Sequence, residues 1–172
     1  MIGRNSMRYG LAIAALLVAT VPAFAAGGEG RYSDLTRCSD NSVSVDLQIA
    51  SCTAALEGHM FQTKKQAVIL LQDLGAAYMQ KGDFDHAFPA FNDAIRLEPN
   101  MWQPYENRGI AFMQFKQYDK ALADFTQVIA LNPDFAKAYH NRGVAKQALG
   151  DKAGADADFA QAAALAPAVT TP

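Results

Sequence analysis

Apolar residues recur at three- and four-residue steps in several stretches of the sequence, and short polar segments separate these stretches. In the middle of the chain, QPYENRGIAFMQF (residues 103–115) and DKALADFTQVIAL (residues 119–131) both show this spacing, which matches the period of an α-helix. Elsewhere Asp83 and Asp151 each follow a glycine between two such stretches, a combination that typically ends one helix and begins the next. The pattern therefore predicts an all-α chain of paired helices.

The helix pairs repeat at a constant interval, in rows that start at Val68, Trp102 and Ala136. We expect the small residues of the repeat to lie where the two helices of a pair cross, because only small side chains allow backbones to approach closely. One pair cannot bury both of its apolar faces, so successive pairs should stack. Four columns are identical in all three rows: Gly75, Gly109 and Gly143 at position 8, Ala87, Ala121 and Ala155 at position 20, Phe91, Phe125 and Phe159 at position 24, and Pro99, Pro133 and Pro167 at position 32.

These columns resemble the tetratricopeptide repeat (TPR), which has a period of 34 with glycine at position 8, alanine at 20, an aromatic residue at 24 and proline at 32. The resemblance implies an α-solenoid of three TPR helix pairs. In the last pair Lys146 and Lys152 stand where the family has aromatic residues, as expected of a terminal unit with one face in water. The resemblance places the three pairs at residues 68–101, 102–135 and 136–169, with a tail at 170–172.

Residues 1–25 have the pattern of a secretory signal peptide. Two arginines precede an uncharged run over residues 11–21, and Ala23 and Ala25 supply the small residues that a signal peptidase needs. The apolar run is about half of the roughly 20 residues that span a bilayer. We therefore expect cleavage after Ala25 and no membrane insertion afterwards, with an uncleaved anchor as the alternative. Either Met1 or Met7 is suited as the start.

A partial unit is predicted at residues 26–67. The stretch DLQIASCTAALE from Asp46 aligns with DKALADFTQVIA from Asp119, which places Cys52 in the aromatic core column of a second helix. The preceding RYSDLTRCSDNS looks irregular, and we expect Cys38 to staple it to this helix through a disulfide with Cys52. Two free buried thiols are the alternative. This arrangement is similar to the N-terminal part of exported bacterial TPR proteins, and it implies a periplasmic or secreted location, where disulfides persist.

Charge and motifs exclude several functions. Without the two arginines of the signal, the chain has 13 Lys and Arg against 17 Asp and Glu, a net charge of −4, which argues against nucleic acid as a partner. No phosphate-binding loop, nucleophile elbow or metalloprotease motif is present. The three histidines have no metal-ligand spacing. We expect no enzyme activity, no cofactor and no metal.

The expected function is that of a protein- or peptide-binding scaffold or adaptor in the bacterial cell envelope. In the TPR family the first helices line a concave groove, and amides and methionines suit an extended peptide. The alternative is structural self-association as a homodimer through the last repeat, around Leu165 and Val169. The groove residues that the resemblance implies are Gln72, Met79, Gln103, Glu106, Asn107, Ile110, Met113, Gln114, Lys137, His140, Asn141 and Val144.

Two further expectations concern particular charged and polar positions of the repeat. Some TPR domains bind a peptide's C-terminal carboxylate with a five-residue clamp, of which Asn107 and Lys137 match here, whereas Gln72, Ala76 and Asn141 do not. We therefore expect no clamp. Two arginines occupy a column that is usually apolar, and we expect each to pair with an aspartate of the second helix: Arg108 with Asp124 and Arg142 with Asp158.

Overall fold

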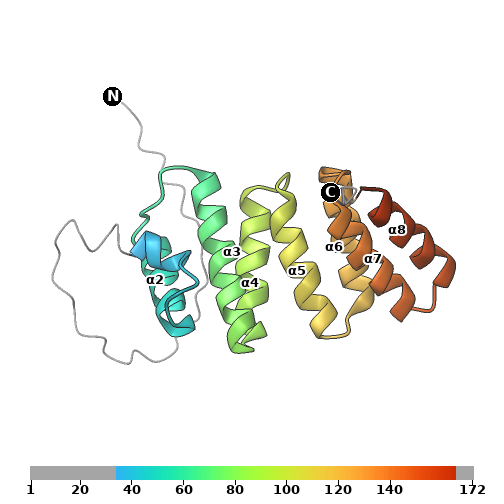
Figure 1. Cartoon of the computed structure of the whole chain (residues 1–172). Coiled ribbons are helices and arrows are strands. Elements are labelled where there is room, and N and C mark those ends of the chain that lie inside the picture. Colours follow the sequence, from blue (N-terminus) through green and yellow to red (C-terminus); the bar gives the residue numbers. More distant parts are fainter. Residues whose placement is uncertain (1–33, 166–172) are drawn as a thin grey trace, which may run out of the picture.

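The computed structural model describes residues 34–165, and the regular structure in this part of the chain is helical. The helices follow one another along a solenoid from one end to the other (Figure 1). The predicted all-α fold of stacked helix pairs is confirmed. The signal segment, the tail and Val169 lie outside the described residues. The helices are α2 (Val45–Glu57), α3 (Lys64–Lys81), α4 (Phe84–Leu97), α5 (Trp102–Gln114), α6 (Tyr118–Leu131), α7 (Ala136–Ala148) and α8 (Lys152–Leu165).

The helices form two layers. Helices α3 and α4, α5 and α6, and α7 and α8 pack as pairs, and the first helices α3, α5 and α7 also contact one another along the row. This places the first helices on one common face, which is the face where the sequence predicts a groove. None of the described helices combines the length and the apolar character that crossing a membrane requires.

The glycine column marks the closest approach within each pair. A Cβ atom added to Gly75 would lie 2.5 Å from Cε1 of Phe91, and one added to Gly109 would lie 2.9 Å from Cε1 of Phe125. The predicted need for glycine is confirmed, but its cause is the aromatic ring of position 24 rather than the backbone of the partner helix. Phe91 and Phe125 are completely buried, so the ring occupies the space that a side chain at position 8 would need.

Local capping fixes where α3, α4 and α8 begin. Gly82 and Gly150 have φ angles of 78° and 88°, in the left-handed region that glycine tolerates best. The carboxylates of the next residues, Asp83 and Asp151, then accept hydrogen bonds from the first-turn amides of α4 and α8, which compensates donors that a helix start leaves unpaired. Thr63 caps α3 in the same way through a capping box, so this helix starts before the repeat proper.

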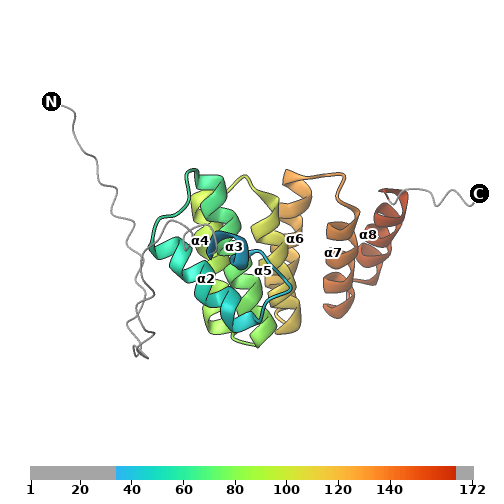
Figure 2. The same cartoon turned by 60° about the vertical axis from the view of Figure 1, so that its left-hand side comes forward.

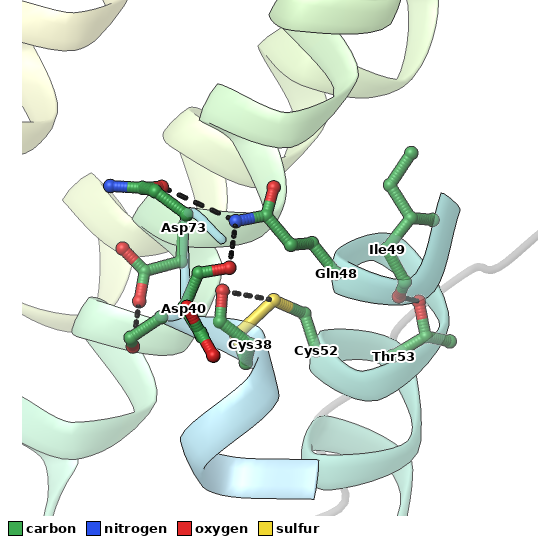
Figure 3. The surroundings of a disulfide bond; sticks show 9 residues. Cys38, Asp40, Gln48, Ile49, Cys52, Thr53 and Asp73 are labelled. Carbon is green, nitrogen blue, oxygen red and sulfur yellow. Dashed lines mark hydrogen bonds between the residues drawn. A yellow bond between two sulfur atoms is a disulfide. The ribbon is translucent and has the colours of Figure 1, made fainter. Parts of the chain in front are cut away.

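The N-terminal unit is held by the predicted disulfide. Cys38 and Cys52 are joined, with their Cα atoms 4.6 Å apart (Figure 3), and both are buried. Cys52 belongs to α2, which packs on α3 as the second helix of a preceding unit would. The expectation of a wholly irregular segment before α2 is wrong for residues 34–38, which are helical. In Figure 2 this short helical turn lies in front of α3.

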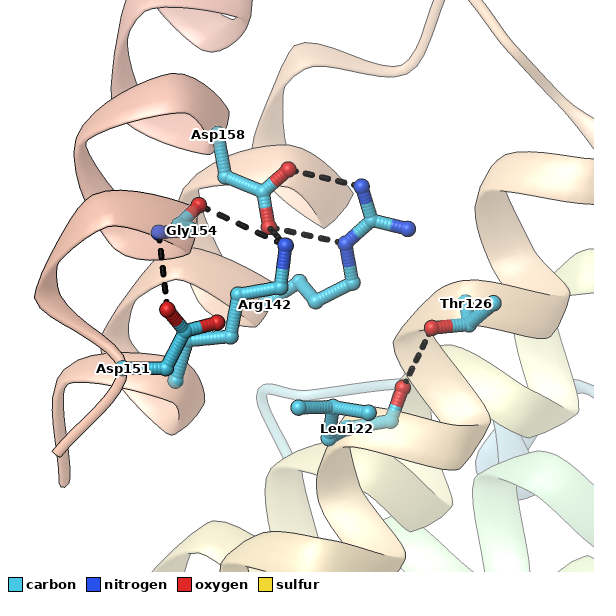
Figure 4. A network of polar contacts seen from close by, with 7 residues as sticks. Leu122, Thr126, Arg142, Asp151, Gly154 and Asp158 are labelled. Carbon is cyan, nitrogen blue, oxygen red and sulfur yellow. Dashed lines mark hydrogen bonds and ion pairs between the residues drawn. The ribbon is translucent and has the colours of Figure 1, made fainter. Parts of the chain in front are cut away.

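The predicted arginine–aspartate pairs are both present. Arg108 donates from Nε and Nη2 to Asp124 at 2.9 and 2.7 Å, and Arg142 donates in the same way to Asp158 at 2.8 and 2.6 Å (Figure 4). Such two-point pairing fixes the orientation of both side chains. In the last unit, Nζ of Lys146 lies 2.9 Å from the same Asp158 carboxylate. The lysine that replaces an aromatic residue therefore adds a second cation to this pair.

Candidate functional site

A hollow of about 280 Å³ lies between α3 and α5 on the common face of the first helices. Four of the residues that line it, Met79, Asn107, Ile110 and Gln114, belong to the predicted groove set. Ala76 and Gln80 complete the lining, at repeat positions that line the groove in the TPR family. The structure thus brings together side chains from two neighbouring units, although the role of these residues in binding stays a prediction.

The hollow combines apolar side chains with uncharged polar ones. Met79 and Ile110 are half-buried and pack against the aromatic cores of their units, whereas Gln80 and Gln114 are exposed. Nδ2 of Asn107 donates a hydrogen bond of 3.5 Å to Oε1 of the predicted groove residue Gln72. Among the described residues, no charged side chain lines the hollow. Its chemistry suits an apolar side chain together with the amide groups of an extended backbone.

The predicted residues nearer to α7 are partly engaged with one another. Nζ of Lys137 lies 2.9 Å from Oε1 of Glu106, which joins α7 to α5. Glu106 is only 8% exposed, so the lysine is the counter-cation of a buried carboxylate. Removing the lysine would leave this carboxylate buried without a cation, which is costly. The pair also leaves Glu106 with little surface to offer a ligand.

The remaining predicted residues lie outside the hollow. Met113 packs against the buried cluster around Phe125, and the ring of His140 lies 5.4 Å from that of Phe159. These contacts give both side chains a packing role within their units. Gln103 on α5 and Asn141 and Val144 on α7 are half-buried.

Residues 34–44, which the disulfide ties to α2, are called the stapled segment. A second, smaller cavity of about 110 Å³ lies where this stapled segment covers α3. Ser39, Asn41, Gln48 and Asp73 supply its polar wall, and it shares Ala76 and Gln80 with the hollow. Sequence reasoning did not select Asp73, although it occupies the same repeat position as Asn107 and Asn141. This shared repeat position is the sequence signal that could have identified Asp73. What the sequence could not indicate is that the stapled segment lies over this position.

Asp73 is the charged group of the second cavity. Its carboxylate accepts a hydrogen bond from the hydroxyl of Ser39. Burial raises the pKa of Asp73 above its ordinary value, and the Ser39 bond only partly opposes this effect, because desolvation disfavours a charged carboxylate. Within residues 34–165, no group of three or more His, Cys, Asp or Glu side chains is placed to hold a metal ion.

The family models that match this chain all describe the same repeat. Models of the tetratricopeptide repeat match residues 68–101 and 136–169, and a further TPR repeat model matches residues 111–150. A comparison with curated proteins found no match.

Solved structures give the same picture. The second TPR domain of Spaghetti (RPAP3), bound to the HSP90 peptide SRMEEVD, is 27% identical with a TM-score of 0.57, over 64% of this chain and 97% of that one. The second TPR domain of human RPAP3, in complex with the HSP70 peptide SGPTIEEVD, is 26% identical with a TM-score of 0.59, over 63% and 90%.

A tetratricopeptide repeat protein from Parabacteroides merdae has a TM-score of 0.72 over 83% of this chain and 56% of its own length. At 19% identity it shows the likeness of fold alone. The repeating columns, the stacked helix pairs and these matches agree, and the chain belongs to the tetratricopeptide repeat family.

Proposed function

We propose that this protein is a binding scaffold that holds an extended segment of another protein along the face formed by α3, α5 and α7. The observation that carries the proposal is the hollow between α3 and α5, whose lining of apolar and amide side chains comes from two successive repeats. An extended peptide presents alternating side chains and regularly spaced backbone amides. Met79 and Ile110 can contact an apolar side chain while Gln80, Asn107 and Gln114 bond to the backbone.

The structural neighbours support a peptide as the partner. Two TPR domains that are 26% and 27% identical to this chain are bound to chaperone peptides that end in EEVD. This chain keeps only Asn107 and Lys137 of the five-residue carboxylate clamp, and Lys137 is paired with Glu106. We therefore propose that the ligand is an internal segment rather than a free C-terminus.

We further propose that the protein works in the bacterial cell envelope after export. The three-part pattern of residues 1–25 supports this location. The disulfide between Cys38 and Cys52 also supports it, because disulfides persist mainly in oxidising compartments. The disulfide would stabilise the N-terminal unit, whose described residues do not form a complete pair of long helices.

A steric block of the hollow tests the proposal. Ala76 is exposed and lines the hollow, so Ala76→Tyr should fill part of it without disturbing the core. Ala123 on α6 is also exposed but does not line the hollow, which makes Ala123→Tyr a matched control. The probe is an immobilised library of heptapeptides, acetylated at the N-terminus and amidated at the C-terminus.

Peptides selected by the wild-type protein should bind Ala123→Tyr normally and Ala76→Tyr at least about tenfold more weakly, since interface energy concentrates in few contacts. Equal binding by both variants would place the peptide site elsewhere. If no peptide is selected and light scattering shows a stable dimer, the structural alternative of self-association through the last repeat would be favoured instead.

A further inference from the structure

Asp73 differs from three buried carboxylates of the repeats, each of which has a cationic partner. Glu106 has Lys137, Asp124 has Arg108, and Asp158 has both Arg142 and Lys146 as counter-cations. Asp73 is half-buried, yet among the described residues no Lys, Arg or His side chain forms an ion pair with it. A desolvated carboxylate without a cation costs free energy, and a cation supplied by a ligand would reduce that cost.

The wall opposite Asp73 is held in place at several points. The disulfide joins Cys38 to α2, and the amide nitrogen of Gln48 on α2 donates to the carbonyl oxygen of Asp40 at 2.8 Å and to Oδ1 of Asn41 at 3.2 Å. Figure 3 shows Asp40 and Gln48 beside the disulfide, with Asp73 facing them from the neighbouring helix. The cavity is therefore a built pocket of the stapled unit rather than a gap beside a loose loop.

We propose that this pocket receives an ammonium group of the bound peptide, which forms an ion pair with Asp73. This inference rests on the proposed binding of a peptide in the neighbouring hollow. An ammonium group carries three hydrogen-bond donors on a compact charge, which suits a small cavity walled by the carboxylate of Asp73, the hydroxyl of Ser39 and side-chain amides. An anion would be repelled by Asp73, and an apolar group would desolvate the carboxylate further.

The position of the pocket defines the partner more closely. Because the pocket and the hollow share Ala76 and Gln80, one extended segment can occupy both. The partner is then a segment in which an ammonium group lies close to an apolar side chain. The ammonium group comes either from a lysine side chain or from the N-terminus of the partner, and the two sources are distinguished by blocking the terminal amine.

The test compares three proteins with defined fluorescent peptides. The peptides derive from the best sequence selected by the wild-type protein from the heptapeptide library, made with lysine or the uncharged norleucine at each position, and with a free or acetylated N-terminus. Asp73→Asn removes the charge but keeps an oxygen that can accept the Ser39 bond. Asp156→Asn removes an exposed carboxylate of α8 that does not line the pocket, and it is the matched control.

We expect the wild-type protein to bind a peptide with an ammonium group at one position about tenfold more tightly than its uncharged counterpart, since hydrogen bonds to charged groups are the stronger ones. Asp73→Asn should lose this preference and Asp156→Asn should keep it. If acetylation abolishes the preference, the source is the terminal amine; if norleucine does, the source is lysine.

Two outcomes would contradict the proposal in distinguishable ways. Peptides that bind the hollow with no preference for an ammonium group, or with a preference that Asp73→Asn retains, would refute the pocket and leave the groove function intact. Failure of every peptide to bind, with a folded protein by circular dichroism, would refute both.

Discussion

The contact between Gly75 and Phe91 allows the repeat packing to be tested by a single added methyl group. The Cβ atom of an alanine at position 75 would lie 2.5 Å from Cε1 of Phe91 and 2.8 Å from both Cδ1 and Cζ. Phe91 is completely buried and packs in one cluster with Ala87 and Ala111. A methyl group at position 75 would therefore have to displace a completely buried ring.

Two opposing effects set the magnitude of the change. Alanine favours a helix over glycine by up to about 1 kcal/mol, whereas overpacking of a buried site costs about 1–3 kcal/mol. Because the approach is far inside ordinary contact distance, we place the steric cost at the upper end. Gly75→Ala should then lower the free energy of unfolding by about 1–2 kcal/mol, and the melting temperature by roughly 3–6 °C.

Urea denaturation followed by circular dichroism measures this difference. Gly143→Ala is the matched control, because Phe159 on α8 is only half-buried and can move away from a Cβ at 2.7 Å. Its loss of stability should be smaller. In a Phe91→Leu background, Gly75→Ala should lose most of its penalty. A Gly75→Ala protein at least as stable as the wild type would show that helix propensity outweighs the ring contact, and would refute the reasoning.

Three further predictions concern the staple, the last ion pair and the signal. Replacing Cys38 and Cys52 together by serine should lower the free energy of unfolding by up to about 3 kcal/mol, measured by urea denaturation, and dithiothreitol should then have no further effect. At Asp158, burial pushes the pKa up, but the bonds from Arg142 and Lys146 together outweigh it and hold the pKa below its ordinary value. The pair should therefore stabilise the fold at pH 7 and lose that contribution as the pH falls below about 4; a stability gap between the wild type and Asp158→Asn that is unchanged at pH 3 would contradict this. Intact mass of protein secreted from a bacterial host should correspond to a chain that begins at Ala26, and a mass that still includes the segment up to Ala25 would exclude cleavage there.

Much of the fold follows from the sequence, because its main constraints are local or periodic. Helix spacing and capping depend on residues a few positions apart, so the caps at Asp83 and Asp151 could be predicted. The pairing of Arg108 with Asp124 was also predictable, since a repeat of fixed length places the same two columns of each pair side by side. Most of the residues that line the hollow were found by the same columns.

The other features of the fold and the site depend on contacts that the spacing of the repeat does not determine. The sequence indicates that position 8 must be small, but only the packed helices show that a phenylalanine ring occupies the space. The ion pair of Glu106 with Lys137 arises from the way in which one unit stacks on the next. The pocket at Asp73 exists because the disulfide holds a non-repeating segment over α3, and such a segment has no equivalent in the other rows. Side chains far apart along the chain, such as Ser39 and Asp73, meet only when the whole unit is folded, so their position is a property of the tertiary structure.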